Sequence, residues 1–311
     1  MKILVDLHHE DLYRSLLLLA ERLGADLFIP KGLEWYTEGK WCVYDHINTA
    51  NQFLSNESYG AYPGVSLDEA RATDWDMVIV THCNHFATWN EMFSDRSPVV
   101  LQVGNNWNYN HEQFMGVRNV LNSTSTQWPQ ALNHVRYHPE LEPVADTAAN
   151  PLSIYSFCHY PTETARNLFS ELGKRLPDWD MRLYGAGTDR CGISGQDNVL
   201  RLAAECGFLF QHKAGGDGYG INIHRAWANG KSVIMDYDHY ADKMSAMCMV
   251  DGLSSIDLSL GIDATANAVT KYVEDYAANS DLIKDIWKRN CDPATEWINK
   301  LKPFFERVLN D

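Results

Sequence analysis

The stretch GFLFQHKAGGDGYGINIHRAWANGKSVIMD, residues 207–236, decides how this chain folds. It begins with a short apolar run at residues 207–211, bounded by polar residues, which is typical of a buried parallel strand. Four glycines within residues 215–220 then interrupt any regular structure. Helical spacing returns at residues 221–229, Gly230 follows where a helix C-cap belongs, and an apolar run resumes. We therefore predict a strand, a glycine loop, a helix and a second strand.

The loop between the first strand and the helix is a candidate binding site. Glycine tolerates positive φ and lets the backbone approach a ligand closely. A helix N-terminus behind such a loop offers free N–H groups and the positive end of the helix dipole, which suits phosphate. One carboxylate, Asp217, lies inside the loop. A turn of this kind can equally serve the structure alone, so both interpretations stay open at this point.

The length and composition are those of a globular protein, with 311 residues for about two domains. The formal net charge of −15 disfavours nonspecific binding to the phosphates of nucleic acids. Seven cysteines without a Cys-x-x-Cys pair are typical of the reduced thiols of a cytoplasm. The longest apolar runs, such as residues 16–20, fall far short of the ~20 residues that a membrane span needs. We expect a cytoplasmic protein without a membrane span, and the sequence indicates no oligomeric state.

Strand and helix signals alternate along most of the chain, which predicts parallel sheets covered by helices on both faces. The segment LEPVADTAANP, residues 141–151, has two prolines and little periodicity, as linkers do. We expect domains at residues 1–148 and 149–285, and a C-terminal helix over residues 286–311 that packs back towards the first domain. Two such sheets in tandem predict a cleft that faces the carboxyl ends of their strands. The predicted strands are residues 3–7, 26–29, 77–81, 99–103, 120–122, 152–157, 181–184, 207–211 and 232–235.

The block at residues 217–234 resembles a motif of the retaining GT-B glycosyltransferases, the family with an E-x7-E motif. That pattern runs approximately EGFGLxxxEAMAxGxPVI, and the chain has DGYGI and then HRAWANGKSVI. The resemblance implies an α/β fold of two Rossmann-like domains facing a central cleft. It also implies transfer of a sugar from a nucleotide-sugar donor, with retention and without a required metal or other cofactor. Weaker similarities follow in the family's order at residues 76–82, 98–104, 119–125 and 184–187.

Two departures from the family pattern concern the donor. The second glutamate of the motif falls on Arg225, and the family's donor-phosphate arginine falls near Cys158 and His159. A guanidinium has five donors and no acceptor, so it does not replace a carboxylate that holds ribose hydroxyls. It can bind phosphate through two parallel hydrogen bonds. Three explanations stay open: a different donor, a ribose held elsewhere, or lost activity.

In the second domain, the resemblance implies a donor site around the glycine loop. Asp217 aligns with the carboxylate on the hydroxyls of the transferred sugar, where it would stabilise positive charge on an oxocarbenium-like centre. The alternative is an aspartate that tolerates turn geometry. Lys213 and Arg225 flank the loop and are candidates for neutralising the diphosphate, although Lys213 also fits a solvated surface lysine. The predicted donor-binding residues are Gly185, Lys213, Gly215, Gly216, Gly218, Tyr219, Gly220 and Arg225.

In the first domain, His82 aligns with a family histidine that faces the donor sugar, and His85 is the alternative equivalent. We take His82 as the catalytic candidate beside Asp217. His8 and His9 precede two carboxylates at the first strand–helix junction, where GT-B proteins approach the acceptor. A carboxylate beside a histidine can act as a general base near neutral pH, whereas helix capping by acidic residues is the alternative. The predicted substrate-binding residues are His8, His9 and His85.

The histidine pairs of the first domain lack the accompanying ligand spacing of a zinc site, so the sequence predicts no metal.

The leading hypothesis is a glycosyltransferase that uses a UDP-, GDP- or ADP-linked sugar. A nucleotide-sugar epimerase or phosphorylase on the same architecture is the alternative enzyme, since a fold does not fix a reaction. A binding protein that kept the site and lost the chemistry is the alternative from another class. The acceptor stays open among a glycan, a small molecule and modified phage DNA, and the negative net charge opposes the last.

Overall fold

The computed structural model of the chain describes residues 1–6, 10–31, 34–37, 63–81, 83–104, 116–125, 127–141, 149–158, 161–185, 188, 196–213 and 218–310. The chain divides into two compact units. Unit 1 comprises Met1–Glu142 together with Pro293–Asp311, and unit 2 comprises Pro143–Asp292.

Unit 1 is built on a seven-stranded parallel sheet with the order β3-β2-β1-β4-β5-β6-β7. The central strands β4, β5 and β6 are buried along their whole length, as expected when helices cover both faces. The strands are β1 (Lys2–Val5), β2 (Asp26–Pro30), β3 (Gly64–Val65), β4 (Met77–Val80), β5 (Val99–Val103), β6 (Asn119–Asn122) and β7 (Asn133–Arg136).

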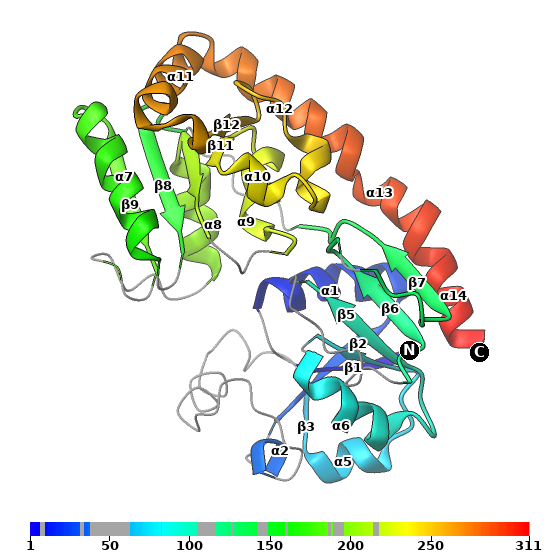
Figure 1. Ribbon diagram of the computed structural model, residues 1–311. Helices are drawn as coiled ribbons and strands as arrows, with labels where there is room; N and C mark the ends of the chain where they lie inside the picture. Colours follow the sequence, from blue (N-terminus) through cyan, green and yellow to red (C-terminus); the bar gives the residue numbers. More distant parts are fainter. Residues whose placement is uncertain are drawn as a thin grey trace. The chain divides into compact units, whose positions relative to one another are not determined.

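The helices of unit 1 lie on both sides of this sheet. The chain moves in one direction from β1 to β2 and in the other from β4 to β5, so right-handed crossovers place their helices on opposite faces. Figure 1 shows α1 and α6 on opposite sides of the strands. The helical segments are α1 (Glu10–Leu23), α2 (Glu34–Thr37), α5 (Leu67–Ala72), α6 (Cys83–Phe93), α13 (Pro293–Glu296), η4 (Trp297–Leu301) and α14 (Lys302–Asn310).

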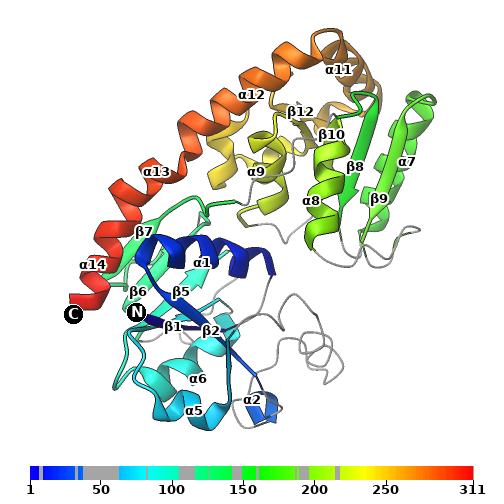
Figure 2. The same cartoon turned by 180° about the vertical axis from the view of Figure 1, so that it is seen from behind.

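Unit 2 is built on a five-stranded parallel sheet with the order β12-β11-β10-β8-β9. Its strands are β8 (Ser153–Phe157), β9 (Asp180–Tyr184), β10 (Phe208–Gln211), β11 (Ser232–Met235) and β12 (Ser255–Asp257). In this unit α7 packs against α11, and α9 packs against α12 (Figure 2). The helical segments are α7 (Glu163–Arg175), α8 (Gln196–Glu205), α9 (Ile221–Ala228), α10 (Tyr237–Tyr240), η2 (Met244–Cys248), η3 (Leu258–Leu260), α11 (Ile262–Glu274) and α12 (Tyr276–Cys291).

The order of the strands defines a switch point in each sheet. In unit 1 the chain direction reverses between β1 and β4, and in unit 2 it reverses between β8 and β10. In open parallel sheets, ligands bind outside the carboxyl ends of the strands at such a point. A ligand site is therefore expected at the segments that follow β1, β4, β8 and β10.

The C-terminal region differs from the single helix expected over residues 286–311. Helix α12 ends at Cys291, Asp292 is extended with φ −61° and ψ 118°, and α13 begins at Pro293. A residue before proline avoids the helical region, whereas proline suits the first helical position. The Asp292-Pro293 pair therefore ends one helix and starts the next.

Among the described residues, no helix combines the length and the apolar character that crossing a membrane requires.

Candidate functional site

The glycine loop of unit 2 follows β10 at the switch point of its sheet. Gln211 ends β10, Lys213 is exposed, and Gly218, Tyr219 and Gly220 are buried. Gly220 is the N-cap of α9 with φ +70°, and no side chain caps the helix there. The positive end of the α9 dipole therefore points into the region of the loop, which favours an anion.

Several predicted site residues lie outside the described part of the chain: His8, His9, His82, Gly215, Gly216 and Asp217.

Gly185 lies on the same edge of the unit 2 sheet as the loop. It follows β9 and has φ +130°, and its carbonyl accepts hydrogen bonds from the backbone and the hydroxyl of Thr188, at 3.2 and 2.6 Å. Strand β8 lies between β9 and β10, so one strand separates Gly185 from Lys213.

Arg225 lies on α9 and is only 4% exposed. Its Nη1 donates a hydrogen bond to Oδ1 of Asn222, one turn earlier, at 3.0 Å. Burial of a guanidinium is costly unless hydrogen bonds or an anion offset it. Arg225 therefore brings a positive charge into the interior on the helix that follows the glycine loop.

Tyr219 is held by packing within unit 2. Its ring stacks on the ring of His224 with centroids 4.1 Å apart and an interplanar angle of 0°. His224 in turn meets Trp227 edge to face. This stack fixes the residue immediately before the N-cap of α9.

The switch point of unit 1 holds a carboxylate–histidine pair. Asp6 follows β1, and its Oδ2 accepts a hydrogen bond from Nδ1 of His85 at 2.9 Å. The side chains of Asp6 and His85 are 0% and 2% exposed. The backbone N–H of Thr81, directly after β4, donates to Oδ1 of Asp6, and the Thr81 hydroxyl donates to the Asp6 carbonyl at 3.0 Å.

This pair orients the imidazole of His85. A carboxylate that accepts from Nδ1 fixes which ring nitrogen carries the proton and how the ring is turned. With Nδ1 donating to the carboxylate, Nε2 of the neutral ring is the acceptor that can take a hydrogen bond from a sugar hydroxyl. His85 was predicted from the sequence and Asp6 was not, because the only signal for Asp6 is its place as an acidic residue at the carboxyl end of the first strand.

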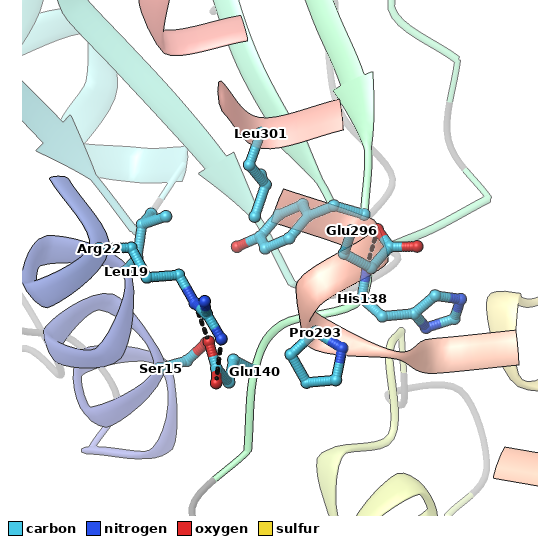
Figure 3. Close-up of a pocket in the computed structure, with 9 residues that line it drawn as sticks. Ser15, Leu19, Arg22, His138, Glu140, Pro293, Glu296 and Leu301 are labelled. Atoms are coloured by element: carbon cyan, nitrogen blue, oxygen red, sulfur yellow. Dashed lines mark hydrogen bonds and ion pairs between the residues drawn. The ribbon is translucent and has the colours of Figure 1, made fainter. Parts of the chain in front are cut away.

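A small cavity in unit 1 lies beside the C-terminal segment (Figure 3). Arg22 of α1 donates to both carboxylate oxygens of Glu140 at 2.6 and 2.7 Å, and Glu296 accepts from the backbone N–H of His138 at 3.1 Å. Burial, together with Lys300 and Arg136, lowers the pKa of His138 to about 3. The cavity holds about 10 Å³, close to the minimum for one water molecule, whereas ligand pockets span about 300–1,000 Å³. It therefore does not fit a nucleotide.

The chain matches no known family model, and no curated protein is similar to it in sequence. Solved structures are similar over almost its whole length. HepE of Anabaena, in complex with UDP, is 12% identical with a TM-score of 0.62, covering 99% of this chain and 98% of that one. A glycosyltransferase of Rickettsia africae is 9% identical with a TM-score of 0.62, covering 100% and 99%.

A third similar structure is an alpha-glucosyltransferase in complex with UDP and a 13-mer DNA. It is 11% identical with a TM-score of 0.63, covering 99% of both chains. At these identities the likeness establishes the fold. The chain has the GT-B fold, which confirms the predicted α/β class with two Rossmann-like domains.

Proposed function

We propose that this chain is a glycosyltransferase that moves a sugar from a nucleotide-sugar donor to an acceptor. The observation that carries the proposal is the glycine loop at the switch point of unit 2, which leads into α9 and its buried Arg225. A helix N-terminus and a guanidinium together suit a diphosphate. The HepE structures support a nucleotide-sugar donor, since they contain UDP or UDP-glucose.

In this proposal, unit 2 binds the donor. The diphosphate lies against residues 215–220 with Lys213 and Arg225 as counter-charges, and Asp217 contacts the transferred sugar. Asp217 stabilises positive charge as the bond to the diphosphate breaks. The transfer proceeds with retention and requires no metal.

Unit 1 serves the acceptor in this proposal. His85, which Asp6 orients, accepts a hydrogen bond from a hydroxyl of the sugar or of the acceptor. His8, His9 and His82 are proposed to contact the substrates from unit 1 as well. A glycan, a small molecule or modified DNA fits as acceptor. The net charge of −15 makes DNA the least favoured of the three, because phosphate backbones are repelled.

The test is to incubate the purified chain with UDP-, GDP- and ADP-sugars and to follow donor cleavage by mass spectrometry. We expect slow donor hydrolysis, with UDP-sugars preferred. An epimerised sugar or phosphorolysis without an acceptor would assign the chain to the alternative enzymes. Binding without turnover, even with acceptor glycans, would make it a binding protein.

Two substitutions test the assigned roles. Asp217→Ala should lower donor hydrolysis by about 100-fold, as loss of transition-state charge stabilisation does. Asp6→Asn should lower turnover by at least ~10-fold without weakening UDP binding, because it acts through the orientation of His85. Asp95→Asn, an exposed carboxylate of unit 1, is the matched control. Equal hydrolysis by Asp217→Ala and the unaltered chain would remove Asp217 from the mechanism.

A further inference from the structure

Two buried cysteine side chains meet in the interior of unit 2, outside the proposed donor site. They are Cys248, the last residue of η2, and Cys291, the last residue of α12. Their sulfurs are 3.7 Å apart, although 43 positions separate the two residues in the sequence. Both are thiols in the structure, and they are 0% and 2% exposed.

A small side-chain movement separates this contact from a disulfide. The sulfurs of a disulfide are about 2.05 Å apart, so the two sulfurs have to approach by roughly 1.7 Å. Rotation about the two Cα–Cβ bonds moves the sulfurs on this scale. The backbones already lie together, because η2 packs against α12. A bond between the two sulfurs therefore fits the fold of unit 2.

His224 of α9 is placed to accept the proton of Cys291. Its Nδ1 lies 3.9 Å from the Cys291 sulfur. The ring is held by its stack on Tyr219 and its edge contact with Trp227. A thiolate is the reactive form of cysteine, and a neighbouring imidazole with Nδ1 as acceptor favours it. Cys291 is therefore the sulfur that reacts first, and Cys248 is the neighbour that completes the bond.

Cys206 shows what a buried thiol without this arrangement looks like. It belongs to the same unit and is 2% exposed, and its sulfur donates to the carbonyl of Ala203 at 3.3 Å. A carbonyl accepts a hydrogen bond but does not take the proton. Burial raises the pKa of the Cys206 thiol to about 12, which keeps it protonated and unreactive.

We propose that Cys248 and Cys291 are an oxidation site, at which a peroxide converts the two thiols into a reversible disulfide. With hydrogen peroxide, the Cys291 thiolate attacks one oxygen, the O–O bond breaks, and Cys291 becomes a sulfenic acid. The departing hydroxide takes the proton that His224 received and leaves as water. The Cys248 sulfur then attacks the sulfenic sulfur, and the hydroxyl group leaves with the Cys248 proton as a second water. A small dithiol restores both thiols by exchange and is itself oxidised to a disulfide.

The crosslink fastens the C-terminal end of α12 to η2. Because both thiols are buried, oxidation proceeds through opening at the end of α12, where a helix frays, and is slow. Once formed, the disulfide closes the chain between the two residues into a loop, which restricts the unfolded chain and stabilises unit 2.

The test treats the reduced, folded full chain with hydrogen peroxide, alkylates the remaining thiols and maps the peptides by mass spectrometry. We expect a linked pair of peptides that contain Cys248 and Cys291, which dithiothreitol separates, whereas Cys206 is alkylated. In urea, the oxidised chain should have an unfolding equilibrium constant for unit 2 at least ~10-fold smaller than the reduced chain. Alkylation of both Cys248 and Cys291 after prolonged oxidation would overturn the proposal. This measurement needs no substitution, so it stands even where a variant fails to fold.

The variant Cys248→Ser tests the order of the two steps. It removes the sulfur that completes the bond, so the sulfenic acid of Cys291 should accumulate and be trapped by dimedone. Cys206→Ser is the matched control and should form the crosslink as the unaltered chain does. Loss of the crosslink in this control, or a dimedone adduct on Cys206 in place of Cys291, would overturn the proposal. Because only the thiols are probed, failure here leaves the proposed glycosyl transfer untouched.

Discussion

At the residue scale, Arg225 distinguishes this chain from the family pattern and has a testable role. If its guanidinium binds the donor diphosphate, Arg225→Met should weaken UDP binding by about 10–100-fold, since a hydrogen bond to a charged group contributes about 1.5–3 kcal/mol. Binding of uridine, which has no phosphate, should change little. Isothermal titration calorimetry with both ligands separates the two effects.

Arg201→Met is the control for Arg225, because Arg201 is an exposed arginine of unit 2 that pairs with Glu205. It should bind UDP as the unaltered chain does. If Arg225→Met weakened uridine and UDP binding equally, Arg225 would act on the nucleoside or on the fold rather than on phosphate.

His138 makes a second prediction at this scale, on the pH dependence of stability. Its pKa is about 3 in the folded chain, because of burial and of Lys300 and Arg136, against about 6.5 when unfolded. Between these values the unfolded chain binds a proton that the folded chain does not. The free energy of unfolding therefore falls as the pH drops from about 6.5 towards 3, by up to ~1.4 kcal/mol per pH unit.

We expect His138→Gln to remove this component of the slope in urea unfolding measured between about pH 5 and 7. His212→Gln, a histidine of unit 2, should leave the slope of unit 1 as it was. If the dependence of the unfolding free energy on pH were the same in His138→Gln, the pKa of His138 would not differ between the folded and the unfolded chain.

At the scale of elements, the start of α9 depends on a glycine in the left-handed region. Gly220 has φ +70°, and a Cβ there would lie 2.9 Å from Cδ1 of Ile223. Gly252 has the same φ with no atom within 4 Å of its Cβ position. Gly252→Ala should therefore cost only the backbone strain, about 1–2 kcal/mol, whereas Gly220→Ala should cost about 1–3 kcal/mol more.

Urea unfolding of the two alanine variants measures this difference, and calorimetry with UDP measures its effect on the donor site. Only Gly220→Ala should weaken UDP binding. Equal destabilisation by the two substitutions would mean that Ile223 moves aside without cost.

Elements with a strong local signal could be predicted from the sequence, and those fixed by their neighbours could not. The strands β4, β5 and β10 are buried on both faces, and their apolar runs predict them directly from the sequence. The strands β3, β7 and β12 have the sequences GV, NHVR and SID, which are too short or too polar to show a pattern. Helix α5 was also missed, although Ser66 and Glu69 form a capping box that signals its start.

The candidate sites differ in the same way: one has a local sequence signal, and the other is formed only by the fold. The glycine loop and α9 are contiguous in the sequence, so one stretch predicts both, and α9 is observed at Ile221–Ala228. The Asp6–His85 pair joins residues 79 positions apart, and only the adjacency of β1 and β4 in the sheet brings them together. A site assembled by strand order has no spacing that can be recognised along the chain.

At the scale of the whole molecule, the chain leaves unit 1, builds unit 2 and then returns. The returning segment, Pro293–Asp311, contributes to the hydrophobic core of unit 1. It is also hydrogen-bonded to the sheet, because Nε of Arg307 on α14 donates to Oδ1 of Asn133 on β7 at 3.2 Å. The core residues that this segment supplies are Leu301, Phe304, Phe305 and Val308. Each such side chain contributes about 1.5–3 kcal/mol when buried, so the four together are comparable with the 5–15 kcal/mol that stabilise a typical domain.

Unit 1 should therefore depend on both ends of the chain, whereas unit 2 is continuous in sequence and has its own core. We expect a fragment of residues 143–292 to unfold cooperatively in urea, and a fragment of residues 1–142 to lack a cooperative transition. Adding a peptide of residues 293–311 to the second fragment should restore the transition, because it returns the missing core residues. A cooperative transition of residues 1–142 alone would show that the seven-stranded sheet is stable without the returning helix.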